Sequence, residues 1–180
     1  MFTPKPICVI ALMVVLQLLS GARAAGQAGG AHSTPAKIAA EVKLSDDGVH
    51  PGTVCRAMVI VTVQDGWHIN AAGASDNNLL STAVDVEKVQ GLDSIVLRYP
   101  PGVERRFEFA DTPLDVYEGS VNIIVELRLA STLEPGTYEV PAVIRYQACS
   151  EKMCLAPASI RIRIPVHVVA AGKKIEREAE

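Results

Sequence analysis

Two cysteines that lie close together in the chain, Cys149 and Cys154, are the residues with the clearest chemistry. A pair at this spacing serves as a structural disulfide, as a redox-active disulfide or as part of a soft-metal site. A disulfide that closes a loop of about six residues stabilises a fold by roughly 2 kcal/mol, near the lower end for such bonds. A bond across a tight, exposed loop is also open to an attacking thiolate, as catalytic disulfides are. Spacing alone leaves the structural and the redox-active interpretations equally open.

Two predicted β-strands position this pair. Residues 138–146 have the composition of a strand, and residues 159–164 alternate between polar and apolar side chains. The segment between the two strands is predicted to be a hairpin loop. Facing residues of antiparallel strands have Cα atoms about 4.5 to 5.5 Å apart, which a disulfide can span. We therefore expect that Cys149 and Cys154 can bond to each other.

The residues around the cysteines, together with two further stretches, carry a family resemblance. The sequence reads Tyr-Gln-Ala-Cys, four residues and Cys-Leu-Ala-Pro at 146–157, Asp-Gly-Trp-His-Ile-Asn at 65–70, and Phe-Glu-Phe at 107–109 before Asp-Val-Tyr-Glu-Gly at 115–119. Over about residues 40–168 the chain resembles the N-terminal periplasmic domain of DsbD, the membrane thiol:disulfide interchange protein. It departs from that family in a loop between the cysteines that is shorter than in some members, and in Ala156, where a first proline is common.

The resemblance implies a periplasmic thiol-disulfide relay that exchanges electrons with thioredoxin-fold proteins. By the same resemblance, a membrane-embedded disulfide reductase reduces the domain, Cys154 forms the mixed disulfides and Cys149 resolves them. Because the sequence has no membrane segment of its own beyond the N-terminal apolar run, we expect this reductase to act in trans. The residues themselves indicate a relay rather than a strong oxidant. No Cys-x-x-Cys opens a helix, and within the loop Glu151 disfavours a thiolate while Lys152 favours it. An enzymatic role, as a component of a protein-disulfide reductase, stays open.

Aromatic residues complete the set of candidate site residues. In the resembled family, a loop in the region of residues 101–119 caps the disulfide and moves aside for partners. This implies Phe109 as the capping side chain, with Phe107 as the alternative; an edge strand with one buried phenylalanine is an equally open interpretation. Trp67 is predicted to pack in the core or at its rim, and Tyr146, at the end of the predicted strand, is adjacent to the site.

Two alternative functions remain open from the sequence. Cys149, Met153 and Cys154, with His68 as a further candidate, are soft ligands that suit Cu(I) in a reducing setting. Taken alone, however, His68 is better interpreted as a surface polar residue, and we assign neither a metal site nor a cofactor. The other alternative is a passive interaction domain whose disulfide is purely structural. A third cysteine, Cys55, is expected to be a small buried side chain without a redox role.

The N-terminus has the pattern of a signal peptide that is cleaved on export to the periplasm. Lys5 provides the positive charge, residues 7–19 form an apolar run, and Ala-Arg-Ala at 22–24 matches a cleavage site. No other run approaches the roughly 20 apolar residues of a membrane span, so we expect no stable membrane insertion. The net charge of −3 without a basic stripe argues against a nucleic-acid partner.

The rest of the chain predicts one all-β domain. We expect a signal peptide at 1–24, a flexible lead-in at 25–36, the domain at 37–169 and a charged tail at 170–180. No long segment has a helical period, and short apolar segments alternate with Gly/Pro turns. Strands are predicted at 38–44, 54–63, 82–89, 94–99, 121–129, 138–146 and 160–168. This spacing favours an immunoglobulin-like β-sandwich.

Overall fold

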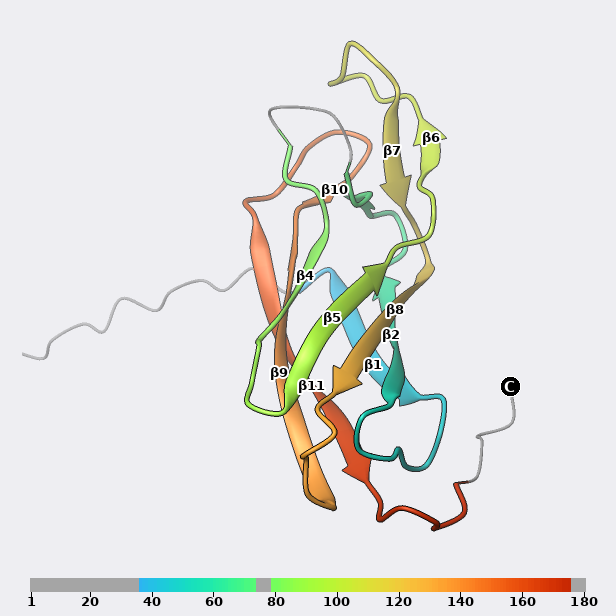
Figure 1. The fold of residues 1–180 in the computed structure, drawn as a ribbon. Coiled ribbons are helices and arrows are strands. Elements are labelled where there is room, and N and C mark those ends of the chain that lie inside the picture. Colours follow the sequence, from blue (N-terminus) through green and yellow to red (C-terminus); the bar gives the residue numbers. More distant parts are fainter. Residues whose placement is uncertain (1–35, 74–78, 176–180) are drawn as a thin grey trace, which may run out of the picture. The chain divides into compact units, whose positions relative to one another are not determined.

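The structure is a computed structural model that describes residues 36–73 and 79–175. The expected signal peptide at 1–24 lies outside the described residues, as does the expected lead-in apart from residue 36. Within the described residues the chain forms eleven β-strands and no helix (Figure 1). The same residues therefore contain no helix that is long and apolar enough to cross a membrane.

Three antiparallel sheets contain all of these strands. The first sheet has the order β1 (Ile38–Leu44), β2 (Val54–Val63), β8 (Ser120–Leu129) and β5 (Leu92–Arg98). The second has the order β11 (Ala158–Val168), β9 (Gly136–Tyr146) and β4 (Ala83–Val86). The third, which we call the end sheet, has the order β10 (Ala148–Cys149), β3 (His68–Asn70), β7 (Leu114–Tyr117) and β6 (Val103–Arg105). The predicted all-β, immunoglobulin-like sandwich is confirmed.

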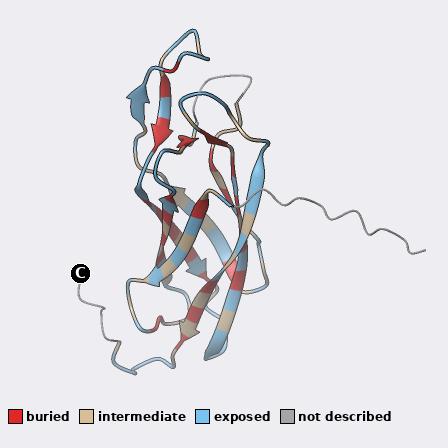
Figure 2. Ribbon diagram, turned by 180° about the vertical axis from the view of Figure 1, so that it is seen from behind, coloured by how far each residue is buried: buried red, intermediate tan, exposed pale blue. Residues whose placement is uncertain are grey.

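The core of the sandwich follows from period-two alternation in the long strands. Alternate residues of β2 are buried, namely Cys55, Ala57, Val59, Val61 and Val63, as predicted. Strand β8 contributes a matching row, and the facing sheet contributes buried residues of β9 and β11 (Figure 2). Burying one such aliphatic side chain stabilises a fold by about 1.5 to 3 kcal/mol. The long strands thus form a rigid scaffold.

The end sheet lies beyond one end of the long strands and is tied to them by tyrosine hydroxyls (Figure 1). The Tyr117 hydroxyl of β7 donates to the carbonyl of Pro100 at 2.8 Å and accepts from the amide of Ala72 at 3.3 Å. The Tyr99 hydroxyl accepts from the amide of Val84 at 2.8 Å. These bonds hold the connections between the long strands and the end sheet in place.

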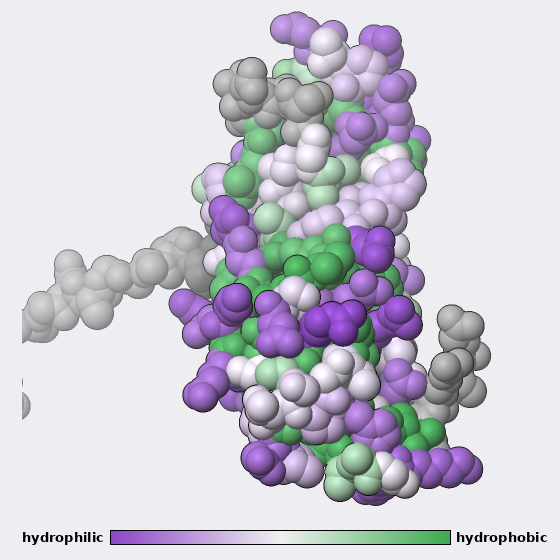
Figure 3. Space-filling view, in the orientation of Figure 1, coloured by the Kyte–Doolittle hydropathy of each residue, from purple (hydrophilic) through white to green (hydrophobic). Residues whose placement is uncertain are grey.

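Hydrophobic and hydrophilic side chains are interspersed over the face seen in Figure 3. Among the described residues, the exposed large hydrophobic side chains are Val96, Val103, Phe109 and Met153. Met153 belongs to the loop between the two cysteines, and Phe109 to the connection between β6 and β7. Two of these four exposed side chains therefore belong to segments next to the cysteine pair.

Candidate functional site

Cys149 and Cys154 form a disulfide, with their Cα atoms 4.0 Å apart. The β9–β11 ladder already ends at the pair Tyr146 and Ala158, so the cysteines do not sit at its end as predicted. Instead they pair with each other in a smaller hairpin inside the connecting loop.

Backbone hydrogen bonds explain the close approach of the two cysteines. The Ser150 amide donates to the Met153 carbonyl at 2.8 Å, and the Leu155 amide donates to the Ala148 carbonyl at 2.9 Å. These bonds flank the cysteines, which makes them a non-hydrogen-bonded pair, the type with the shorter Cα separation. The distance is shorter than predicted because the sequence did not reveal which type of pair they form.

Two polar side chains hold the small hairpin in shape. The Ser150 hydroxyl accepts hydrogen bonds from the amides of Lys152 and Met153, both at 3.3 Å. The Gln147 amide nitrogen donates to the Leu155 carbonyl at 3.0 Å, and its oxygen accepts from the Leu80 amide at 2.9 Å. The loop that presents the disulfide is thus fixed internally by Ser150 and to a neighbouring segment by Gln147.

The two cysteines differ in exposure. Cys149 is 0% exposed, whereas Cys154 is only partly buried and the side chains of residues 151–153 are exposed. A thiolate needs access to the sulfur that it attacks. Of the two cysteines, Cys154 is therefore the accessible one.

The remaining described cysteine, Cys55, lies in the core, as predicted. It is a free thiol, 3% exposed, on the inward face of β2. Burial, with a smaller contribution from Asp46, raises the pKa of this thiol from 9.0 to about 11. Because the thiolate is the reactive form, Cys55 is chemically inert at neutral pH.

His68 corrects a prediction: the structure places it in the interior, 2% exposed, rather than on the surface. It lies in β3 directly opposite Cys149 of β10, and β7 covers the other edge of β3. Its Nε2 atom is buried and has no hydrogen-bond partner among the described residues. Burial lowers the pKa of His68, while the nearby Glu118 and Glu151 act in the opposite direction.

The two candidate capping phenylalanines lie in the connection between β6 and β7. Phe107 is 6% exposed and stacks on His68 with ring centroids 4.1 Å apart. Phe109 is 39% exposed and stacks on Phe107 at 5.2 Å. The three rings are nearly parallel and form a compact group rather than a single column, because the Phe109 centroid lies only 6.4 Å from that of His68. Phe107 is thus the buried ring, and Phe109 the outer one.

Trp67 and Tyr146 both pack in or against the main hydrophobic core. Trp67 is partly buried against the core, and the Lys37 ammonium lies 4.6 Å from the centroid of its ring. Tyr146 is 2% exposed and belongs to the same core. The prediction that Trp67 packs in the core or at its rim is confirmed.

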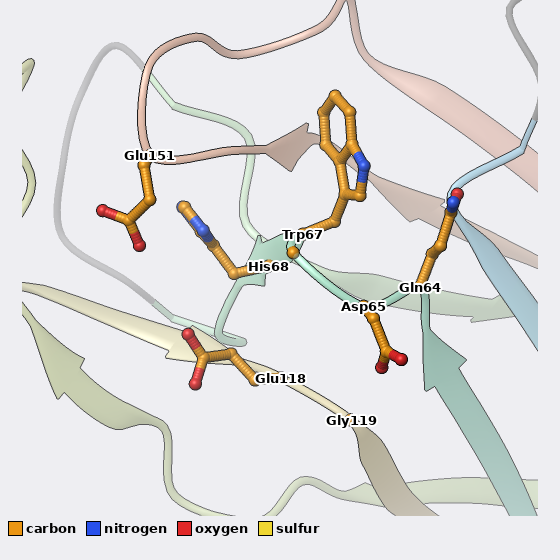
Figure 4. Close-up of a pocket in the computed structure, with 8 residues that line it drawn as sticks. Gln64, Asp65, Trp67, His68, Glu118, Gly119 and Glu151 are labelled. Carbon is orange, nitrogen blue, oxygen red and sulfur yellow. The ribbon is translucent and has the colours of Figure 1, made fainter.

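A hollow of about 280 Å³ lies beside His68. It is lined by Gln64, Asp65, Gly66, Trp67, His68, Glu118, Gly119 and Glu151. Figure 4 shows Glu118 and Glu151 on two sides of the imidazole. Glu118 forms an ion pair with Arg105 at 2.8 Å. The lining itself contains carboxylates but no lysine or arginine, so the hollow is acidic.

The described residues contain no group of three or more His, Cys, Asp or Glu side chains arranged to hold a metal ion. The Cu(I) alternative, which used Cys149, Cys154, Met153 and His68, therefore gains no geometric support. What sequence reasoning missed is the place of His68 in the site. Nothing in the sequence of a three-residue strand signals which strands lie beside it.

Comparisons with known proteins agree with this geometry. The family model described as "Thiol:disulfide interchange protein DsbD, N-terminal" matches residues 36–164. The N-terminal periplasmic domain of ScsB from Proteus mirabilis has the same fold, with a TM-score of 0.50 and 14% identity over 69% of this chain. The match spans 45% of the ScsB chain, less than half of its length.

A second solved structure is less similar. It contains the DsbD N-terminal domain from Neisseria meningitidis in complex with the PilB N-terminal domain, and matches with a TM-score of 0.43 and 16% identity. That match covers 70% of this chain and 80% of the other. No curated protein sequence matches the chain. Because the family model covers well over half of its residues, the chain belongs to the family of N-terminal thiol:disulfide interchange domains of DsbD.

Proposed function

We propose that this domain is a periplasmic relay that exchanges electrons with thioredoxin-fold proteins through Cys149 and Cys154. A membrane-embedded disulfide reductase reduces the pair, and the reduced domain passes the electrons on. The observation that carries the proposal is the disulfide in a tight hairpin, with one cysteine accessible and the other buried. Family membership supports the class of partner, and the sequence pattern at residues 1–24 supports export.

Reduction of the domain begins at the accessible sulfur. A thiolate of the reductase attacks Sγ of Cys154, a new S–S bond forms between them, and Cys149 leaves with the electron pair of the broken bond. A second thiolate of the reductase then attacks the reductase's own sulfur in the mixed disulfide, and Cys154 leaves as a thiolate. The domain now holds two thiols, and the reductase holds the disulfide.

Electron transfer to the acceptor runs through the same chemistry in the opposite sense. The Cys154 thiolate attacks the disulfide of a thioredoxin-fold protein, and the Cys149 thiol then resolves the mixed disulfide after losing its proton. The acceptor leaves as a dithiol, and the Cys149–Cys154 bond forms again. Two electrons move in each cycle.

Phe109 is proposed as the cap that an incoming protein displaces. It is the exposed member of a group of three nearly parallel rings, whose other members, Phe107 and His68, are buried. Since Phe107 is buried with Leu114 and Val116 in a small cluster, it is suited to hold the connection in place rather than to move. Phe109 and the exposed Met153 offer apolar surface to a partner.

Trapping of mixed disulfides tests the proposal. The probe is an oxidised thioredoxin, mixed with the reduced domain and analysed on non-reducing gels. Cys149→Ser, which removes the resolving thiol, should accumulate a covalent complex, whereas Cys154→Ser should form none. Cys55→Ser serves as the matched control and should turn over as the wild type does. Normal exchange by Cys154→Ser would refute the assignment.

The midpoint potential of the Cys149–Cys154 couple separates a relay from a structural bond. A relay should equilibrate with dithiol carriers, whose potentials lie between about −120 and −270 mV. A purely structural disulfide has a potential below about −300 mV. Equilibration against glutathione redox buffers, followed by alkylation of free thiols, gives this value directly.

A further inference from the structure

The buried Nε2 atom of His68 requires an explanation. Buried polar atoms nearly always have a hydrogen-bond partner, and leaving one without a partner is costly. His68 is 2% exposed, and its Nε2 has none among the described residues. The structure is that of the oxidised pair. A hydrogen-bond partner that exists only in the reduced state would explain why Nε2 has none in this structure.

The strand register identifies that partner. His68 of β3 pairs with Cys149 of β10, and Cys149 pairs with Cys154 on its other side. Directly opposite residues of antiparallel strands project to the same face, with Cβ atoms about 4.5 to 5.5 Å apart. His68, Cys149 and Cys154 therefore form one row across the end sheet. The imidazole is the neighbour of the buried cysteine rather than of the accessible one.

We propose that His68 accepts the proton of the Cys149 thiol when Cys149 resolves a mixed disulfide, and returns it when the disulfide is opened. This inference rests on the proposed relay function. In the oxidised pair Cys149 has no proton to donate, which leaves Nε2 without a partner. On reduction the Cys149 S–H becomes a donor to the buried Nε2.

The proton and electron balance is complete in each direction. During resolution, His68 takes the thiol proton, the Cys149 thiolate attacks Sγ of Cys154, the mixed S–S bond breaks and the partner's sulfur leaves with the electron pair. During opening, a partner thiolate attacks Cys154 and Cys149 leaves as a thiolate; the imidazole takes up a proton from the adjoining hollow and passes it to this thiolate. No oxidant other than the partner's disulfide takes part.

The surroundings of His68 favour a neutral imidazole that can accept a proton. From the face side, the uncharged rings of Phe107 and Phe109 stack over it. The charged groups that act on it are Glu118, at the end of β7, and Glu151, in the disulfide loop. Glu118 is partly neutralised by its ion pair with Arg105.

Burial outweighs both carboxylates and lowers the pKa of His68, so the ring is neutral at pH 7. The hollow lined by Glu118 and Glu151 adjoins the imidazole and gives the proton a route to solvent (Figure 4).

A measurement on the wild-type protein tests the inference without any substitution. The ¹⁵N chemical shifts of the His68 ring are compared between the oxidised and the fully reduced domain at pH 7.5. The Nε2 resonance should move towards the value of a hydrogen-bonded acceptor on reduction, while the rings of His50 and His167 stay unchanged. An Nε2 shift that is the same in both redox states overturns the inference.

His68→Phe supplies the kinetic test, because phenylalanine keeps the stack on Phe107 and the buried volume. Resolution of a preformed mixed disulfide with thioredoxin should be at least about tenfold slower in this variant at pH 7. The difference should shrink as the pH rises, because hydroxide then removes the Cys149 proton without help from the imidazole. A merely structural role would slow the variant equally at every pH, and that result would refute the proposal.

Controls separate this inference from the relay proposal. His167→Gln, a histidine substitution outside the site, should resolve at the wild-type rate. If the wild-type protein exchanges no electrons with thioredoxin, and Cys149→Ser traps no mixed disulfide with it, the relay itself is wrong. If the wild type exchanges normally and His68→Phe has the same rate and pH profile, only the role of His68 is wrong. Thermal unfolding of both variants confirms that the compared proteins are folded.

Discussion

At the scale of single residues, the two buried cysteines differ in their bonding partners. Cys149 is bonded to the partly exposed Cys154, whereas Cys55 is a free thiol in the core. In the proposed relay, the position of each cysteine therefore separates the reactive pair from the inert thiol, and Cys154 is the residue that partners attack.

The raised pKa of Cys55 predicts a loss of stability in alkaline solution. The unfolded thiol ionises near pH 9, but the folded one only near pH 11, so the folded state holds its proton more tightly. The contribution of this thiol to stability is fully present below pH 9. The free energy of unfolding should fall by up to about 3 kcal/mol as the pH rises through 11. Urea unfolding of the wild type and of Cys55→Ala at pH 8 and pH 10.5 measures the effect. An identical pH dependence in the two proteins would contradict it.

The lowered pKa of His68 predicts the opposite pH dependence. The folded state disfavours the imidazolium, so the unfolded state binds protons at higher pH than the folded state does. The stabilising contribution is present above pH 6.5 and should be lost as the pH falls towards the lower folded pKa. Denaturant unfolding at pH 7.5 and pH 5.5 should show a larger loss in the wild type than in His68→Phe. His167→Gln, the matched control, should follow the wild type.

Among the residues of the site, the pairing of two cysteines that are close in the chain was predictable. The burial of a residue by strands that are distant in the chain was not. The pairing of Cys149 with Cys154 followed from their spacing within a predicted hairpin, and it is confirmed. The interior position of His68 depends on β10 and β7 lying on either side of it, partners that are about 50 to 80 residues distant in the chain. No local pattern records such contacts.

At the scale of elements, the end sheet is the part that the sequence did not reveal. Its strands are two to four residues long, too short for period-two alternation to be recognised. Each short strand lies next to a long strand in the chain: β3, β6 and β10 follow β2, β5 and β9, and β7 precedes β8. The ends of the long strands thus bring the short strands together. The predicted long strands β1 and β2 have the bounds expected from their alternation. The scaffold was thus predictable, but the sheet that holds the site was not.

Gly102, just before β6, is where the end sheet tolerates least change. A Cβ atom at this position would lie 2.7 Å from Cβ of Ala71 and 2.8 Å from Cβ of Asp115, too close for either to remain in place. Gly102→Ala should therefore cost about 1 to 3 kcal/mol in the free energy of unfolding. Gly136→Ala, whose added Cβ would meet nothing closer than 3.6 Å, is the matched control. Equal stabilities of the two variants in urea would contradict this packing argument.

At the scale of the whole molecule, a relay must stay folded in both redox states. The buried rows of β2 and β8, facing β9 and β11, form a continuous core that does not include Cys149. Such a core was expected from the alternation of the long strands, and the all-β sandwich is confirmed. Stability therefore resides in the sandwich, while the redox chemistry is confined to one loop and the end sheet.

Reduction of the disulfide is consequently expected to lower the stability only slightly. The bond closes a loop with a sequence separation of 5, for which the chain-entropy model gives about 2 kcal/mol. Native domains are typically stable by about 5 to 15 kcal/mol, so the reduced protein should stay folded at room temperature. Urea unfolding with and without a dithiol reductant measures the difference. The double variant Cys149→Ser with Cys154→Ser, insensitive to reductant, should match the reduced wild type. Cooperative unfolding on reduction alone would mean that the bond maintains the fold, which is incompatible with a domain that cycles between the two states.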